Sequence, residues 1–184
     1  MSDEQAASLS VYPVAPENEE IDEAIIAVIV DNEPGVLARV VGLISARGYN
    51  IESLTVAETD VEKHTSRITV VTRGTPSKIE QIKAQLGRLV PVRRVIDVGV
   101  EKDAIKRELA LVKIVGKGEA RVEAMRLAQI FRANAIDTTH TSFVFEVTGA
   151  RDKINAFIDL MRPLGLAEIS RTGVLSIRRG PEPD

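Results

Sequence analysis

The chain has 184 residues, of which 44% are hydrophobic and 28% charged, and its formal net charge is −3. It contains no cysteine, which excludes disulfides, thiolate metal sites and cysteine nucleophiles. Its aromatic content of 3% supplies few stacking platforms for single-stranded nucleic acid. No segment resembles a signal peptide or an apolar span of roughly 20 residues, so we expect a cytoplasmic protein that contacts neither membrane nor nucleic acid.

The start of the chain is strongly acidic. Residues 1–23 contain seven carboxylates and no lysine or arginine, so the remainder carries about +4. Such a segment, with two prolines and little apolar periodicity, is typical of a disordered tail, and its negative charge disfavours phosphate binding. We assign it no function, and we treat residues 181–184 as a second tail.

Residues 24–100 show the hydrophobic periodicities of one βαββαβ unit. The pattern predicts, in chain order, strand Ala24–Val30, helix Val36–Arg47, strands Asn50–Ala57 and Ser66–Thr72, helix Ser77–Leu89 and strand Val92–Val100. This is the ferredoxin-like order. The second helix carries Ser77 before Glu80 as a capping-box signature.

The loop that joins the first strand to the first helix has the composition of a binding site. Asn32 is a good helix cap, Pro34 suits a first helical position, and Gly48 suits the left-handed residue that ends a helix. Free N–H groups at a helix start attract carboxylates, and Gly35 lacks the Cβ that would keep a ligand from the backbone. Because the loop holds no catalytic residue type, it indicates binding of a small polar molecule rather than its conversion.

A second βαββαβ unit is predicted over residues 108–180, after a charged linker or short helix at 101–107. Its predicted elements are strand Leu109–Val115, helix Glu119–Arg132, strands Ala135–Thr139 and Ser142–Thr148, helix Arg151–Met161, and final strands on either side of Arg171-Thr172-Gly173. The predicted fold class is therefore α+β, with two tandem ferredoxin-like domains.

Candidate catalytic and metal groups are few. His64 and His140 are the only histidines, and no third ligand stands at metal-like spacing. Gly116-Lys117-Gly118 lacks the full spacing of a phosphate loop and is better explained as a turn before a helix. We expect neither a catalytic residue nor a metal site in this chain.

Two segments carry a resemblance to a known family. The sequences DNEPGVLAR (31–39) and RGYNIESLTV (47–56) resemble the regulatory (small) subunit of acetolactate synthase, also called acetohydroxyacid synthase. Later segments agree with the family in the same order, including SRITV (66–70), RELALVK (107–113) and RTGV (171–174). The resemblance covers about residues 24–180 and implies that the first unit is an ACT domain.

The resemblance also implies a ligand and a site. The effector would be valine or another branched-chain amino acid, bound where two ACT domains meet in a homodimer. One chain would contribute Asn32, Gly35, Val36 and Leu37, and its partner Asn50 and Ile51. From the residues alone, Asn32 is more often simply a cap and Asn50 a turn residue.

The family further marks Ile51, Glu52 and Ser53 as part of the surface that contacts the catalytic subunit. Considered alone, Glu52 and Ser53 are explained equally well by the polar outward face of a strand. Thiamine diphosphate, Mg²⁺ and FAD belong to the catalytic (large) subunit in this family, so we expect no cofactor in this chain.

Three classes of function are compatible with a chain of this kind. The first is a regulatory subunit that activates the catalytic subunit of branched-chain amino acid biosynthesis and confers feedback inhibition, or alternatively a free-standing ACT-domain sensor that regulates another enzyme. The second is a transcription regulator, which needs a helix-turn-helix module that neither the acidic tail nor the two units supply. The third is a small enzyme, for which no acid–base pair or nucleophile stands at convincing spacing. The regulatory subunit is favoured.

Overall fold

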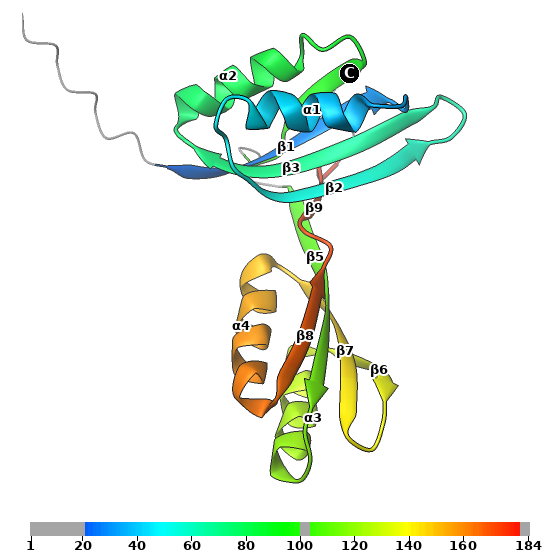
Figure 1. Cartoon of the computed structure of the whole chain (residues 1–184), viewed down its shortest axis with the longest axis vertical. Coiled ribbons are helices and arrows are strands. Elements are labelled where there is room, and N and C mark those ends of the chain that lie inside the picture. The colour runs from blue at the N-terminus through cyan, green and yellow to red at the C-terminus, as the bar shows by residue number, and fades with distance from the viewer. Residues whose placement is uncertain (1–20, 100–103, 181–184) are drawn as a thin grey trace, which may run out of the picture.

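The computed structural model describes residues 21–99 and 104–180, which form two βαββαβ units, one above the other in Figure 1. The predicted fold class is thus confirmed. Most of the predicted acidic tail, the tail at 181–184 and the first part of the predicted linker lie outside the described residues. The tail is shorter than predicted, because Asp22 and Glu23 already belong to the first strand.

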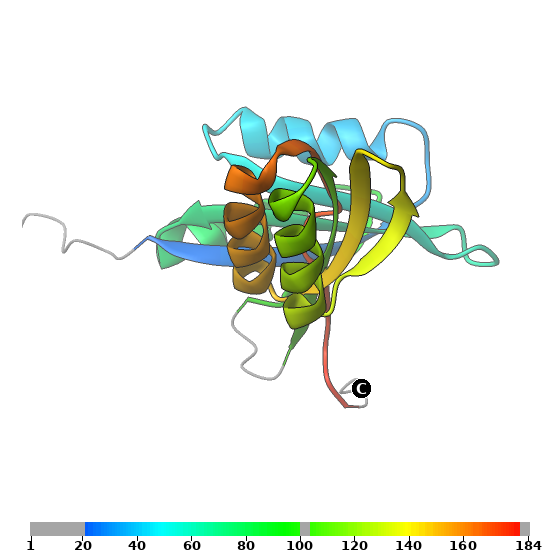
Figure 2. The ribbon, with the colours of Figure 1, turned by 90° about the horizontal axis from the view of Figure 1, so that it is seen from below.

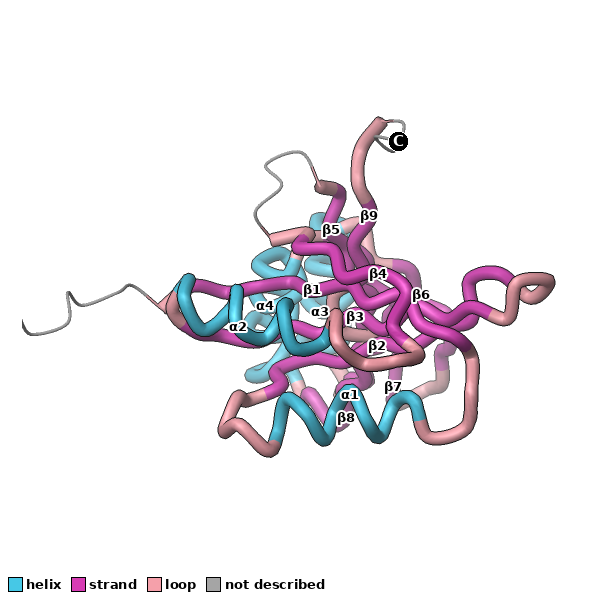
Figure 3. Tube along the Cα trace, turned by 90° about the horizontal axis from the view of Figure 1, so that it is seen from above, coloured by secondary structure: helices cyan, strands magenta, loops and turns pink. Residues whose placement is uncertain are grey.

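The first unit is a four-stranded antiparallel sheet with two helices on one face. Its elements are β1 (Asp22–Asp31), α1 (Val36–Ser45), β2 (Ile51–Asp60), β3 (Thr65–Gly74), α2 (Pro76–Leu86) and β4 (Val92–Asp97). The strand order is β2-β3-β1-β4, so β2 and β4 are the edges. Seen from above, α1 and α2 lie over the strands (Figure 3).

Both faces of this first sheet are buried along β1. Ile26, Val28 and Val30 point into the core under α1 and α2, together with residues of β3 and both helices. Ile25 and Ala27 point to the opposite face and belong to a separate apolar cluster. The uninterrupted apolar run of β1 therefore reflects burial on two sides, as in strands that are covered on both faces.

The second unit repeats the topology. Its elements are β5 (Ile105–Val115), α3 (Glu119–Phe131), β6 (Asn134–Thr138), β7 (Ser142–Gly149), α4 (Arg151–Met161), a 3₁₀ turn (Arg162–Leu164), β8 (Leu166–Arg171) and β9 (Leu175–Ile177). The strand order is β6-β7-β5-β8, and β9 pairs with the start of β5. Helices α3 and α4 lie side by side on one face (Figure 2), where Phe145 packs edge-on against Phe157.

The boundaries differ from the predictions where distant segments pair. Residues 105–107, expected in a linker or short helix, are strand because they pair antiparallel with Leu175–Ile177 of β9. Helix α2 begins at Pro76 with Thr75 at its cap and no side-chain capping bond, so Ser77 is not the cap. Helix α1 ends as predicted with a left-handed glycine: Gly48 has φ +74°, and the amide of Tyr49 bonds back to the carbonyl of Ile44.

The two units meet where β9 and the start of β5 reach the face of the first sheet that lies opposite α1 and α2 (Figure 1). Val174, just before β9, is 5% exposed and belongs to one apolar cluster with Ile25, Val71, Ile96 and Val98. Arg67 of β3 donates from Nη2 to the carbonyl oxygen of Ser176 at 2.8 Å. The segment around β9 therefore anchors the second unit to the first.

Phe145 provides a test of the second core. The Phe145→Ala substitution removes a fully buried ring that contacts Phe143 and Phe157, and we expect it to lower the free energy of unfolding by about 3–5 kcal/mol. Chemical denaturation followed by circular dichroism measures this change. Ile130→Ala is the control, because Ile130 is 65% exposed on α3; equal losses for the two variants would contradict the assigned core.

Candidate functional site

The loop between β1 and α1 is built differently from the prediction. Gly35, with φ +84°, is the residue that caps α1, and no side chain caps the helix. Asn32 is therefore not the cap, because its Nδ2 donates instead to Oε1 of Glu58 on β2 at 3.2 Å. Its backbone amide donates to the carbonyl of His64 at 2.7 Å. Pro34 lies in the turn before the helix rather than inside it.

The helix start retains the chemistry of an anion site. The amide of Val36 bonds to the carbonyl of Glu33 at 3.3 Å, whereas those of Leu37 and Ala38 lack a helical acceptor by geometry. The Val36 side chain points into the core and is 7% exposed, so only its backbone faces the loop. Leu37 is 38% exposed, and the space where a Cβ of Gly35 would lie is empty within 4 Å. A small carboxylate therefore has access to the backbone here.

The other two predicted ligand residues lie at the opposite end of β2. Asn50 is exposed, and its carbonyl accepts a hydrogen bond from Oγ1 of Thr72 at 2.7 Å. Ile51 is half-buried against the first core. Asn32 contacts Glu58, which lies near the other end of β2. At the usual rise per residue of an extended strand, Glu58 is about 24 Å from Ile51. A single chain therefore does not bring the two groups of predicted residues together.

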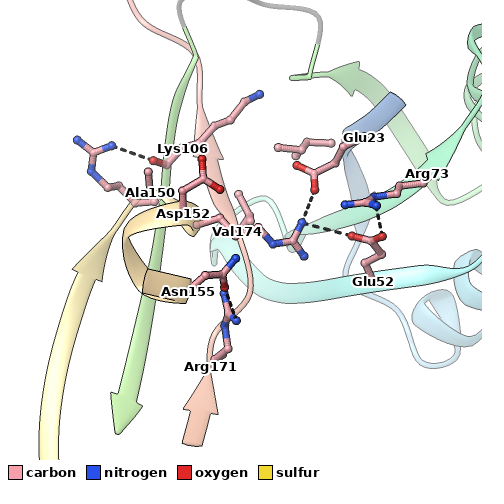
Figure 4. Close-up of a pocket in the computed structure, with 12 residues that line it drawn as sticks. Glu23, Glu52, Arg73, Lys106, Ala150, Asp152, Asn155, Arg171 and Val174 are labelled. Carbon is pink, nitrogen blue, oxygen red and sulfur yellow. Dashed lines mark hydrogen bonds and ion pairs between the residues drawn. The ribbon is translucent and has the colours of Figure 1, made fainter. Parts of the chain in front are cut away.

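Glu52 and Ser53 face the second unit of their own chain. The pairing of β2 with β3 shifts between Ile51 and Ser53, so Glu52 is the extra residue of an irregularity in the strand, as in a β-bulge. Its Oε1 contacts Nε of Arg73 at 2.9 Å and its Oε2 contacts Nη1 of Arg151 at 3.3 Å (Figure 4). Glu52 is exposed as a residue, but both of its carboxylate oxygens contact arginines.

Ser53 lies against the loop that leads into β9. A Cβ added to Gly173, which has φ +79°, would meet Oγ of Ser53 at 2.0 Å. Only glycine fits between these two segments with this backbone conformation. The predicted contact of Ile51, Glu52 and Ser53 with a catalytic subunit stays a prediction, and two of its three side chains already contact their own chain.

A cleft of about 550 Å³ lies between the two units. It is lined by charged and polar residues of both, together with Ile25, Ala150 and Val174; the charged and polar ones are Glu23, Glu52, Arg73, Lys106, Arg107, Arg151, Asp152, Asn155 and Arg171 (Figure 4). Sequence patterns did not reveal this cleft, since its residues come from segments up to about 150 positions apart. Local periodicity carries no information about such encounters.

One wall of the cleft is fixed by a bidentate ion pair. Arg171 donates from Nε and Nη2 to the two carboxylate oxygens of Glu108 at 2.6 and 2.8 Å, and from Nη1 to Asn155 at 2.9 Å. These hydrogen bonds from Arg171 to Glu108 raise the pKa of the guanidinium despite its partial desolvation. Glu108 is only 3% exposed, so Arg171 neutralises a buried charge.

The comparison with family models covers both units. Residues 26–94 match the model described as the AHAS small subunit-like ACT domain, and residues 107–180 match the model for the small subunit of acetolactate synthase. Curated relatives include a probable acetolactate synthase small subunit of Archaeoglobus fulgidus, 45% identical over 84% of this chain and 96% of the relative. The acetolactate synthase isozyme 3 small subunit of Salmonella typhimurium is 44% identical over 85% of this chain and 95% of its own. The chain belongs to the acetolactate synthase small-subunit family.

The solved structures agree with this assignment. The acetolactate synthase small subunit of Thermotoga maritima has a TM-score of 0.79 and 35% sequence identity, and the match covers 88% of this chain and 99% of that one. The high coverage means that both units are shared with this family member. The first unit is accordingly an ACT domain, as the resemblance implied.

Within residues 21–99 and 104–180, no three histidine or acidic side chains gather as a metal ion would require. None of the helices in these ranges is long and apolar enough to cross a membrane.

The Glu108–Arg171 pair yields an asymmetric prediction. Arg171→Met leaves the buried carboxylate of Glu108 without its charge partner, whereas Glu108→Gln leaves a guanidinium that is one-third exposed and reaches water. We expect Arg171→Met to lower the free energy of unfolding by about 3 kcal/mol, and Glu108→Gln to lower it by less. Denaturation of both variants at neutral pH measures the difference. If Glu108→Gln lowered the free energy of unfolding as much as Arg171→Met or more, the unpaired buried carboxylate of Glu108 would not be the larger penalty.

Proposed function

We propose that this chain is the regulatory subunit that activates the catalytic large subunit of acetolactate synthase and confers feedback inhibition by valine or another branched-chain amino acid. The observation that carries the proposal is the pairing of family membership with a glycine-capped helix start open to a small carboxylate. The catalytic subunit would hold the thiamine diphosphate, Mg²⁺ and FAD, and this chain none of them. Both subunits would work in the cytoplasm.

The open edge of β2 supports a homodimer. Strand β2 is ten residues long and stands at the edge of its sheet, where its free N–H and C=O groups suit pairing with another chain. In an antiparallel pairing of two β2 strands about a two-fold axis, the start of one strand lies beside the end of the other. The partner's copies of Asn50 and Ile51 would then approach Glu58 and its neighbour Asn32, which unites the two groups of site residues.

The chemistry of such a junction suits a free amino acid. The amides of Leu37 and Ala38, at the positive end of the α1 dipole, would bind the carboxylate. Amide oxygens of Asn32 and of the partner's Asn50 would accept hydrogen bonds from the ammonium group. The exposed Leu37 and the partner's Ile51 would cover the branched side chain.

Reconstitution tests the function directly. Mixing this chain with an acetolactate synthase catalytic subunit is expected to raise acetolactate formation from pyruvate, and valine is expected to reverse that rise. Coupling between two sites typically changes affinities by about 5- to 150-fold, which is large enough to be measured by titrating the complex with valine. Leucine and isoleucine serve as comparison ligands, and the catalytic subunit alone is the control. Activity that does not change on adding this chain would favour a free-standing sensor of another enzyme.

Substitutions in the loop test the position of the effector. Gly35→Asp places a carboxylate at the helix start, and Asn32→Ala removes an amide oxygen; each is expected to weaken valine inhibition at least about tenfold while activation persists. Gly180→Asp is the matched control, because Gly180 has φ +81° and open space around its missing Cβ, like Gly35 with φ +84°. Valine inhibition that survives both loop changes would show that the effector binds elsewhere.

A further inference from the structure

Three charged side chains form a row across the face of the first sheet that faces the second unit. Glu23 on β1 is the register partner of Arg73 on β3, and Arg73 contacts Glu52 on β2 through Nε and Oε1 at 2.9 Å. The row thus runs acid, base, acid over three adjacent strands. With two carboxylates and one guanidinium, it carries a net charge of −1.

Arg151 of the second unit completes this row. Its Nη1 donates to Oε2 of Glu23 and, at 3.3 Å, to Oε2 of Glu52 (Figure 4). The four side chains, which we call the Arg151 cluster, are electrically neutral. The side chains of Arg151, Glu23 and Glu52 are 30%, 34% and 21% exposed, whereas that of Arg73 is 60% exposed. The ion pairs of Arg151 are therefore partly desolvated and stronger than those of a fully solvated surface, and Arg73 stands mostly in solvent.

The place of Arg151 in its helix adds to the interaction. It is the first residue of α4, and the cap residue Ala150 offers no side-chain hydrogen bond. The carboxylates of Glu23 and Glu52 therefore stand near the positive end of an uncapped helix, where negative charge is favourable. The cluster joins the start of α4 to two strands of the first sheet.

Among the described residues, the Arg151 cluster and the apolar anchor around Val174 both join the two units. Both Val174 and Arg151 line the cleft of about 550 Å³, so the units are not packed continuously against one another. The anchor consists of buried apolar side chains, the tight fit of Gly173 on Ser53 and the hydrogen bond from Arg67 to the carbonyl of Ser176. The ionic contact therefore holds the start of α4 to the first sheet at a place separate from this anchor.

We propose that the Arg151 cluster transmits occupancy of the effector site to the second unit, with Arg151 as the positioning residue. The proposal rests on the proposed function, because it takes the start of β2 as one wall of the effector site. Glu52 directly follows Asn50 and Ile51 in the chain. A ligand bound by those two residues displaces the segment that carries Glu52, and this displacement changes the ion pair between Glu52 and Arg151.

The energetic basis is a difference in affinity between two arrangements. The ligand favours the arrangement of β2 in which the Arg151 cluster is altered, and the second unit then presents a different surface to the catalytic subunit. Coupling of this kind is reciprocal, so the catalytic subunit changes the affinity for the ligand by the same factor by which the ligand changes the affinity for that subunit. A ligand without such a difference would shift nothing.

Arg151→Gln tests the transmission in the reconstituted complex. The variant removes the charge and keeps a side chain of similar polarity. Valine is expected still to bind by titration calorimetry, while the activity that remains at saturating valine rises at least about fivefold over the wild type. Arg162→Gln is the matched control, since Arg162 forms an exposed ion pair with Asp159 just beyond the other end of α4. A contact with a merely structural role would lower the melting temperature and leave the remaining activity unchanged.

A double variant shows whether Arg151 acts through Glu52. If it does, Glu52→Gln combined with Arg151→Gln relieves inhibition no more than Arg151→Gln alone, when each activity is expressed relative to the same complex without valine. Additive relief by the two substitutions would overturn the assignment of Glu52 as the link.

The orientation of the units is measured separately. Because the chain has no cysteine, spin labels attached to Lys78→Cys on α2 and Gln129→Cys on α3 report one distance, with labelled chains diluted in unlabelled ones. Valine is expected to shift this distance in the wild-type background and not in Arg151→Gln. A shift that persists in Arg151→Gln, together with unchanged inhibition, would overturn the proposal. Failure of valine to bind or inhibit the wild type would instead refute the proposed function.

Discussion

Strand β2 is constrained on three sides at once, and the docking of the two units and the proposed effector site both depend on how it meets those constraints. Ile51 and Leu54 pack toward the core beneath the helices, while Glu52 and Ser53 meet the second unit on the other face. The hydrogen-bonding edge stays open to a second chain. A regular strand alternates its side chains strictly, so consecutive residues facing the same unit require the register shift after Ile51.

The two units share a topology but bury their sheets differently. In the first unit the face away from the helices is covered by Val174 and the segment around β9, so β1 is apolar at nearly every position. In the second unit β5 alternates buried and less buried residues, because among the described residues only one face is covered by helices. The same chain fold therefore supports two sequence patterns, and the difference follows from the docking of one unit on the other.

The candidate effector site illustrates how family resemblance and geometry complement each other. The loop composition already indicated a carboxylate at a helix start, and the structure supplies the reason: Gly35 in a left-handed conformation ends the loop and leaves the first amides accessible. Asn32 was expected to act locally as a helix cap, but its side chain makes a tertiary hydrogen bond to Glu58 on β2. Its distance from Asn50 along the strand explains why the site is proposed at a junction of two chains.

The sequence by itself determined the order of the elements, their division into two βαββαβ units and the left-handed glycine at the end of α1, because periodicity and glycine chemistry act over a few residues. It also indicated the family, through two loops whose residues stand close together in the chain. Only the tertiary structure decided that residues 105–107 are strand, that Glu52 and Ser53 face the second unit, and that Arg151 bridges two strands of the first sheet. These features join residues about 70 to 130 positions apart; whether such residues meet depends on how the two units pack, and no local pattern encodes that.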